Sequence, residues 1–174
     1  MDRRKTHKSQ SSLNYETLVF RLLEKHMKAR MGDKCNVHFK IATASDVTVQ
    51  VYDKTYLLTH GDQFDNNPGS CFERVRAGDA AKRKRAHDSK LPVHDVLICG
   101  HYHQYQAVGN IITNGSLVGY NEFAFHSNLA IERPQQALFV QHPALGITRH
   151  SGVFADEPTA VKSGVAPVSL ELAY

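Results

Sequence analysis

The sequence has few cysteines, no tryptophan and no long hydrophobic run. Its 174 residues include three cysteines, Cys35, Cys71 and Cys99, and none of them forms a C-x-x-C pair. An odd number of widely spaced cysteines argues against a disulfide framework or a zinc ribbon and favours a reducing compartment. No apolar stretch approaches the roughly 18 residues that span a membrane, and the basic start MDRRKTHKSQSS lacks the apolar core of a secretory signal. We therefore expect a cytoplasmic protein with no membrane partner.

Charge and hydrophobic content are ordinary for a globular chain. There are 21 Lys and Arg against 17 Asp and Glu, a formal net charge of +4, and 41% of the residues are hydrophobic. This composition excludes collagen-like, coiled-coil and wholly disordered chains. One domain is expected at roughly 100–200 residues per domain. Because the last residues are rich in Pro, Ala and Val without a clear period, we predict a domain over residues 1–154 and a tail over residues 155–174.

The hydrophobic pattern predicts alternating helices and strands. Apolar residues recur at helical spacing over residues 13–31, and residues 61–92 form a long connection whose second half has helical composition. Runs rich in Val, Ile, Thr and Tyr predict strands at residues 37–43, 46–53, 55–60, 95–100, 105–113 and 136–142. Buried continuous strands joined through helical segments indicate an α/β fold with a mixed sheet.

Two histidines directly follow a strongly apolar run, in the sequence DVLICGHYH. If extended geometry continues past Gly100, their two-residue spacing turns His101 and His103 to one side. His60 repeats the arrangement, because the run YLLT ends in HGD. Ligands of open α/β sheets bind just beyond the carboxyl ends of the strands, and neutral imidazoles suit Zn, Mn, Fe or Ni. The pattern predicts a shared metal site.

The remaining chemistry-bearing residues give weaker signals. Asp62 either ligates a metal, orients an imidazole or only forms a turn, and the turn is the preferred interpretation. The other eight histidines are expected to be surface residues or hydrogen-bonded core residues without a catalytic role: His7, His26, His38, His87, His94, His126, His142 and His150. Asn114-Gly115 is interpreted as a turn.

The pair YLLTHGD and DVLICGHYH resembles the last two metal-binding motifs of the calcineurin-like metallophosphoesterase family. In that family an isolated histidine ends one strand and G-H-x-H ends a later one. The stretch IITNGSLVGY also resembles the family's segment after G-H-x-H, and the likeness extends from residue 13 to 148, closest to phage-borne members. It implies the C-terminal half of a four-layer sandwich, in which helices flank two packed mixed β-sheets.

The resemblance also implies a ligand set and a reaction. His60 and His101 would bind one ion of a dinuclear Mn, Fe or Zn site, and His103 the other. Such a site activates water for hydrolysis of a phosphoester, here most readily a phosphodiester.

The chain also departs from the family. We expect its first three motifs, D-x-H, G-D-x-x-D and G-N-H-D/E, to be missing from the chain, and we expect no Asp or Glu at the site in a position to bridge two ions. Three neutral imidazoles do not offset the charge of two ions, so we expect at most one bound ion. Little or no activity is then expected from the chain alone. A complementing N-terminal half or a second copy would be needed, and an uncovered sheet edge favours oligomers.

A basic run lies in the helical connection at Lys82, Arg83, Lys84 and Arg85. Such a cluster either contacts nucleic-acid phosphates or is only the solvated face of a helix, and the solvated face is the preferred interpretation. The run supports the alternative function, which is a catalytically inactive binding or assembly module with a partial metal site.

Overall fold

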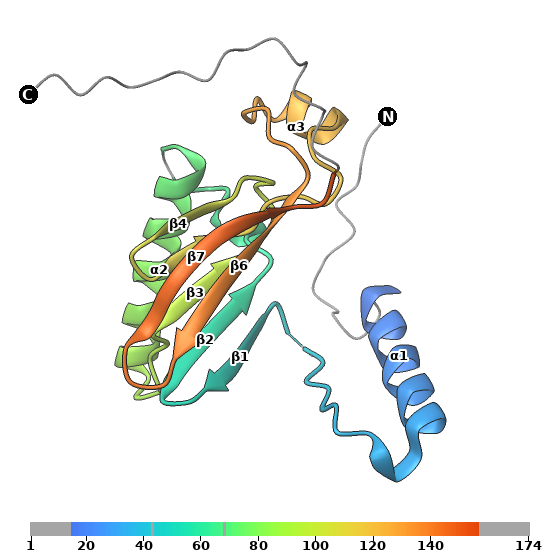
Figure 1. The fold of residues 1–174 in the computed structure, drawn as a ribbon. Helices are drawn as coiled ribbons and strands as arrows, with labels where there is room; N and C mark the ends of the chain where they lie inside the picture. The colour runs from blue at the N-terminus through green and yellow to red at the C-terminus, as the bar shows by residue number, and fades with distance from the viewer. Residues whose placement is uncertain (1–14, 43, 68, 157–174) are drawn as a thin grey trace, which may run out of the picture.

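The computed structural model describes residues 15–42, 44–67 and 69–156 (Figure 1). In chain order its elements are α1 (Tyr15–Met31), the 3-10 turn η2 (Gly32–Lys34), β1 (Asp46–Val51), β2 (Lys54–Thr59), the 3-10 turn η3 (Asp62–Phe64), α2 (Cys71–Asp88), β3 (Val96–Cys99), β4 (Gln106–Val108), β5 (Ile111–Thr113), α3 (Glu122–His126), β6 (Gln135–His142) and β7 (Gly146–Phe154). None of the helices in these residues has the length and hydropathy needed to cross a bilayer.

The strands form one five-stranded sheet and one hairpin. The sheet order is β1-β2-β3-β5-β4, with β2, β3 and β5 parallel and the two outer strands antiparallel to their neighbours. The predicted α/β class with a mixed sheet is confirmed. β2 and β3 are paired in register up to Thr59 and Cys99, so the next residues of both strands leave the sheet side by side.

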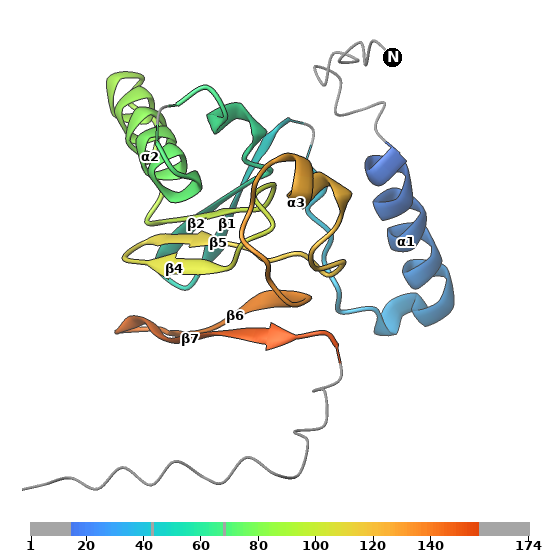
Figure 2. The same cartoon turned by 90° about the horizontal axis from the view of Figure 1, so that it is seen from above.

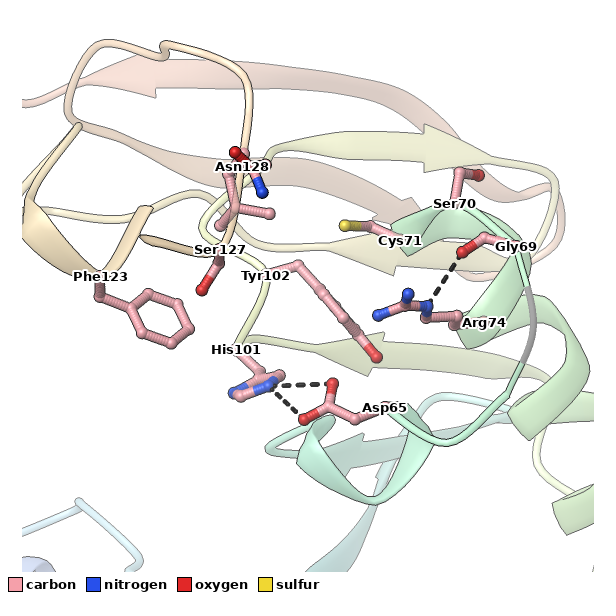
Figure 3. A pocket seen from close by; sticks show the side chains of 11 residues that line it. Asp65, Gly69, Ser70, Cys71, Arg74, His101, Tyr102, Phe123, Ser127 and Asn128 are labelled. Carbon is pink, nitrogen blue, oxygen red and sulfur yellow. Dashed lines mark hydrogen bonds and ion pairs between the residues drawn. The ribbon is translucent and has the colours of Figure 1, made fainter. Parts of the chain in front are cut away.

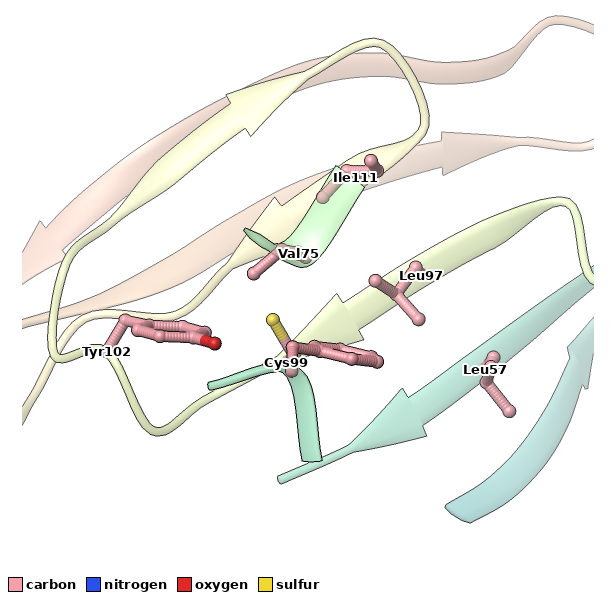
Figure 4. Packing of buried hydrophobic residues seen from close by; sticks show 7 residues of the cluster. Leu57, Val75, Leu97, Cys99, Tyr102 and Ile111 are labelled. Atoms are coloured by element: carbon pink, nitrogen blue, oxygen red, sulfur yellow. The ribbon is translucent and has the colours of Figure 1, made fainter. Parts of the chain in front are cut away.

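The sheet lies between α2 and the β6–β7 hairpin, as the view from above shows (Figure 2). On the α2 side, Val75 and Leu97 are completely buried in a cluster that also holds Cys99, Tyr102 and Ile111 (Figure 4). On the hairpin side, the rings of Tyr56 and Phe139 stack with centroids 5.7 Å apart. Helix α2, the five-stranded sheet and the β6–β7 hairpin thus form three layers (Figure 2). The likeness to half of a four-layer sandwich stays a prediction.

Helix α2 is fixed at its start and along one face. Ser70 caps it: the Ser70 hydroxyl accepts from the Glu73 amide, and the Glu73 carboxylate accepts from the Ser70 amide. Gly78 lies against Phe64, and a Cβ on Gly78 would come 2.1 Å from the Phe64 ring. The glycine therefore lets the helix approach η3 closely, which brings the start of α2 next to the ends of β2 and β3.

Helix α1 is confirmed, but its apolar residues are not buried. Leu18, Val19, Leu22 and Leu23 expose between 45% and 59% of their surface. Within the described residues, α1 contacts chiefly the short turn η2 that follows it. The apolar periodicity correctly predicted a helix but not what covers it.

Several predicted boundaries are wrong. Residues 37–43 show no strand where the structure describes them, and the single strand predicted at 105–113 is two strands joined by a turn at Gly109 and Asn110. The sequence interpretation missed α3 and β7 altogether. Residues 1–12 and 157–174, which include nearly all of the predicted tail, lie outside the described residues, so the domain boundary stays a prediction.

Asn114 does more than form a turn. Its amide oxygen accepts from the Ala137 backbone N–H at 2.7 Å, and its Nδ2 donates to Gln136 at 2.8 Å. A Cβ on Gly115 would come 2.6 Å from the Gln135 carbonyl oxygen. The Asn-Gly pair therefore joins the end of β5 to β6 and links the two sheets.

Candidate metal centre and adjoining pocket

The structure brings His60 and His101 together at the carboxyl ends of β2 and β3. Their ring centroids are 5.0 Å apart. The two strand ends approach closely at Gly61, which has φ +110° and on which a Cβ would come 3.1 Å from the Gly100 carbonyl oxygen. Gly61 thus permits two imidazoles to meet at this edge.

The loop that carries His101 and His103 is not extended. Their φ values are +70° and +55°, in the left-handed region that non-glycine residues seldom occupy. The extended geometry assumed past Gly100 is therefore absent at these two residues. Both rings nevertheless approach the same residue, Phe123, with centroids 5.9 Å and 4.9 Å from its ring. Strained backbone of this kind costs energy and concentrates at functional sites.

Asp65 is a member of the cluster that the sequence interpretation missed. Its two carboxylate oxygens lie 3.1 Å and 3.0 Å from Nε2 of His101. The expectation that no acidic residue accompanies the histidines is thus wrong. The missed signal is that residues 61–65 read Gly-Asp-Gln-Phe-Asp, with the spacing G-D-x-x-D, directly after His60. Asp62 opens the η3 turn, and Asp65 comes directly after that turn.

Nδ1 of His103 is a buried nitrogen without a hydrogen-bond partner in the described part of the chain. Burial and the neighbouring His101 lower the pKa of His103. The neutral imidazole, which is the form that binds metals, is therefore favoured at this position. A buried nitrogen without a partner is rare in folded proteins and calls for an explanation, of which a bound ion is one.

The donor types suit a divalent metal ion, but their arrangement is incomplete. Imidazole nitrogens with a carboxylate oxygen are ligands for Zn, Mn or Fe. Within residues 15–42, 44–67 and 69–156, however, no three His, Cys, Asp or Glu side chains are arranged to hold an ion. The cluster therefore presents donor atoms of the right types without three of them converging on one point.

The four residues of the predicted basic run, residues 82–85, divide into two pairs on α2. Lys82 forms an ion pair with Asp46, and Arg83 bonds Asp79 and the carbonyl oxygens of residues 94 and 95. Lys84 and Arg85 are exposed. The predicted phosphate-binding cluster is thus reduced to its second half, because the first half stabilises the fold.

A pocket of about 280 Å³ adjoins the candidate metal centre (Figure 3). His101 and Asp65 form one part of its wall, and the first turns of α2 form another. The rings of Tyr102 and Phe123 also line the pocket. The pKa of the Tyr102 hydroxyl is raised by burial and by the negative charge of Asp65, so that hydroxyl stays protonated. The lining residues come from η3, α2, the histidine loop, α3 and the loop after α3: Asp65, Gly69, Ser70, Cys71, Arg74, His101, Tyr102, Phe123, Ser127, Asn128 and Leu129.

No family model and no curated protein sequence matches the chain. Solved structures similar to it include Vps29 of Entamoeba histolytica complexed with Zn²⁺, at 16% identity and TM-score 0.41, covering 69% of this chain and 68% of that one. An archaeal phosphodiesterase has 15% identity and TM-score 0.36, covering 63% of this chain and 50% of that one. A predicted phosphoesterase of Streptococcus pneumoniae has 15% identity and TM-score 0.34, covering 70% and 74%. At such low sequence identities and TM-scores, these likenesses carry no argument about the site. Its interpretation rests on the residues of this chain.

Proposed function

We propose that this chain supplies the histidine part of a divalent-metal centre for phosphoester hydrolysis, with phosphodiesters as the preferred substrate. One observation carries the proposal: the rings of His60 and His101 lie 5.0 Å apart at the carboxyl ends of two parallel strands, and Asp65 contacts His101. Ligands of open α/β sheets bind at such ends. The orphaned Nδ1 of His103 beside them supports the same function.

A divalent ion in such a centre lowers the pKa of bound water and polarises a phosphoryl oxygen. This chain would contribute neutral imidazoles, and Asp65 would offset part of the positive charge. Because three donors do not converge in the described residues, we propose that the chain holds at most one Mn, Fe or Zn ion. A complementing N-terminal half or a second copy would complete the centre.

The alternative is a binding or assembly module without turnover. The exposed Lys84 and Arg85 on α2 favour it, because adjacent exposed cations can contact phosphates of a nucleic acid. The absence of a convergent set of three donors in the described residues agrees with it as well. The two functions differ in whether a bound metal produces hydrolysis.

The proposal is tested by Mn²⁺-dependent hydrolysis of a chromogenic phosphodiester, measured for the wild type, His101→Ala and His87→Ala. His87 is an exposed histidine at the end of α2 and serves as the matched control. With a second copy of the chain completing the centre, we expect slow hydrolysis that requires Mn²⁺, disappears in His101→Ala and persists in His87→Ala. Hydrolysis that is unchanged in His101→Ala would contradict the proposal. Metal binding through His101 without any hydrolysis would favour the binding module.

A further inference from the structure

The pocket beside the candidate centre contains one arginine, and its position is well defined. Nε of Arg74 donates to the Gly69 carbonyl oxygen at 2.9 Å, and the Arg74 carbonyl accepts from Nδ2 of Asn67 at 2.9 Å. Both ends of the residue are therefore held by the loop that leads into α2. The dashed line in Figure 3 marks the first of these bonds, and the rest of the guanidinium group turns toward Tyr102 inside the pocket.

The terminal nitrogens of Arg74 have no carboxylate partner among the residues that the structure describes. Two other arginines show the contrast: Arg83 pairs with Asp79, and Arg133 makes two bonds to Asp156. A guanidinium group presents its donors in a rigid fork that matches phosphate and carboxylate oxygens. Arg74 thus offers an ordered anion-binding fork to the pocket.

The pocket has opposite charges on different parts of its wall. Asp65 and His101 lie at the candidate metal centre, whereas Arg74 lies on α2. Ser127 and Asn128 add short polar side chains from the loop after α3, as Figure 3 shows. A volume of about 280 Å³ is slightly below the roughly 300–1,000 Å³ of pockets that take drug-sized ligands. A pocket of this volume accommodates a compact molecule.

We propose that Arg74 is the anion-recognition residue of this pocket and that its ligand is a small phosphorylated compound with two anionic groups. One group pairs with Arg74, and the other faces His101 and Asp65, where a bound divalent ion would offset the carboxylate charge. This inference deepens the proposed function and rests on it for the second group. It narrows the substrate class from phosphoesters in general to compact, doubly anionic ones.

The test uses pyrophosphate as the probe, with its binding measured by titration calorimetry in Mn²⁺ and in metal-free buffer. Four proteins are compared: the wild type, Arg74→Gln, Arg74→Lys and Arg76→Gln. Arg76 is the matched control, because it is an exposed arginine on the same helix. Thermal unfolding of each variant checks that the fold is kept.

We expect wild-type binding in both buffers, tighter with Mn²⁺. Arg74→Gln should weaken it about 10- to 100-fold in both, the size of a charge-assisted contact. Arg74→Lys should lie between the two, since it keeps the charge and loses the fork, and Arg76→Gln should match the wild type. Equal losses in Arg74→Gln and Arg76→Gln, or no binding by the folded wild type, would overturn the inference. Arg74-dependent binding in a protein that takes up no Mn²⁺ would instead contradict only the proposed metal centre.

Discussion

Strand β3 has a histidine–aspartate pair near each of its ends, and the two pairs differ in almost every other respect. Before the strand, Nε2 of His94 lies 2.6 Å from Oδ1 of Asp79, and the two side chains are only 5% and 8% exposed. After the strand, His101 lies 3.0 Å from Asp65, with exposures of 17% and 45%. The same two residue types thus form one buried pair and one pair at the edge of a pocket.

The difference lies in what else each pair bonds. Asp79 also accepts from Nε of Arg83, and the same arginine donates to the carbonyl oxygen of His94. The buried pair is therefore satisfied within the protein and stabilises the contact between α2 and β3. The pair after the strand adjoins an orphaned nitrogen on His103 and a pocket, so it has capacity for a ligand. A histidine–aspartate pair is informative about function only together with its surroundings.

The largest effect is expected from breaking the buried pair. Replacing Asp79 by Ala leaves the buried His94 without its carboxylate partner and removes one of the bonds of Arg83, and the loss should be about 3–5 kcal/mol of unfolding free energy. Asp65→Ala is the matched change at the other end, and it should cost less than about 1 kcal/mol because the Asp65 side chain is 45% exposed. Urea unfolding of both variants measures the contrast. Equal losses would erase the distinction between the pairs.

The buried pair should also produce an acid transition. Burial alone would raise the pKa of Asp79, but hydrogen bonds from His94 and Arg83 outweigh it and bring the pKa below the ordinary 3.8. A depressed pKa in the folded state adds stability that is present above pH 3.8 and lost as the pH falls through the folded value. Unfolding free energy measured from pH 6 to pH 2 should therefore fall in the acid range. The fall should be smaller in Asp79→Asn, and an identical profile would contradict this assignment.

A change in the pair after β3 should lower the affinity for metal and leave the stability to urea nearly unchanged. Asp65→Asn keeps the size of the side chain and removes its charge, so we expect Mn²⁺ affinity to fall roughly 10- to 100-fold, as for residues that ligate or orient a ligand. Its unfolding midpoint in urea should stay close to that of the wild type. Metal titration and urea unfolding on the same preparation separate the two effects. Unchanged metal affinity would remove Asp65 from the centre.

The smallest effect is expected in the basic run of α2. There too, some side chains are bonded within the protein and others are exposed to a ligand. Lys84→Ala and Arg85→Ala should each reduce the salt dependence of DNA binding by about one phosphate contact, a change of roughly 0.9 in the log–log slope. Lys82→Ala should leave that slope unchanged, because Lys82 is paired with Asp46. Fluorescence anisotropy at several salt concentrations measures the slopes. A slope that none of the three variants changes would discard the nucleic-acid interface.

Strands β2 and β3 and the histidines that follow them could be predicted from the sequence, because hydrophobic runs and glycines are local signals. The run before Gly100 predicted β3, and the run before His60 predicted β2. Parallel strands end at one edge of the sheet, so the meeting of His60 and His101 followed from the same pattern. α2 followed from composition, although its capping pair Ser70 and Glu73 was overlooked.

The features that the sequence did not reveal depend on the conformation of loops and on distant partners. Left-handed φ values at His101 and His103 carry no signal when the residue is not glycine. Asp65 reaches His101 only because the η3 turn folds back beneath the end of β3, and Asp79 meets His94 from a position 15 residues away along the chain. Residues 37–43 alternate as a strand does, yet those of them that the structure describes, 37–42, join neither sheet.

The central claim is that the cluster after β3 is a partial metal centre. It is tested most directly by equilibrium dialysis against Mn²⁺ and Zn²⁺, followed by metal analysis of the wild type, His101→Ala and His87→Ala. The account predicts one weakly bound equivalent in the wild type and in His87→Ala, and none in His101→Ala. Two tightly bound equivalents, or binding that His101→Ala leaves unchanged, would contradict it.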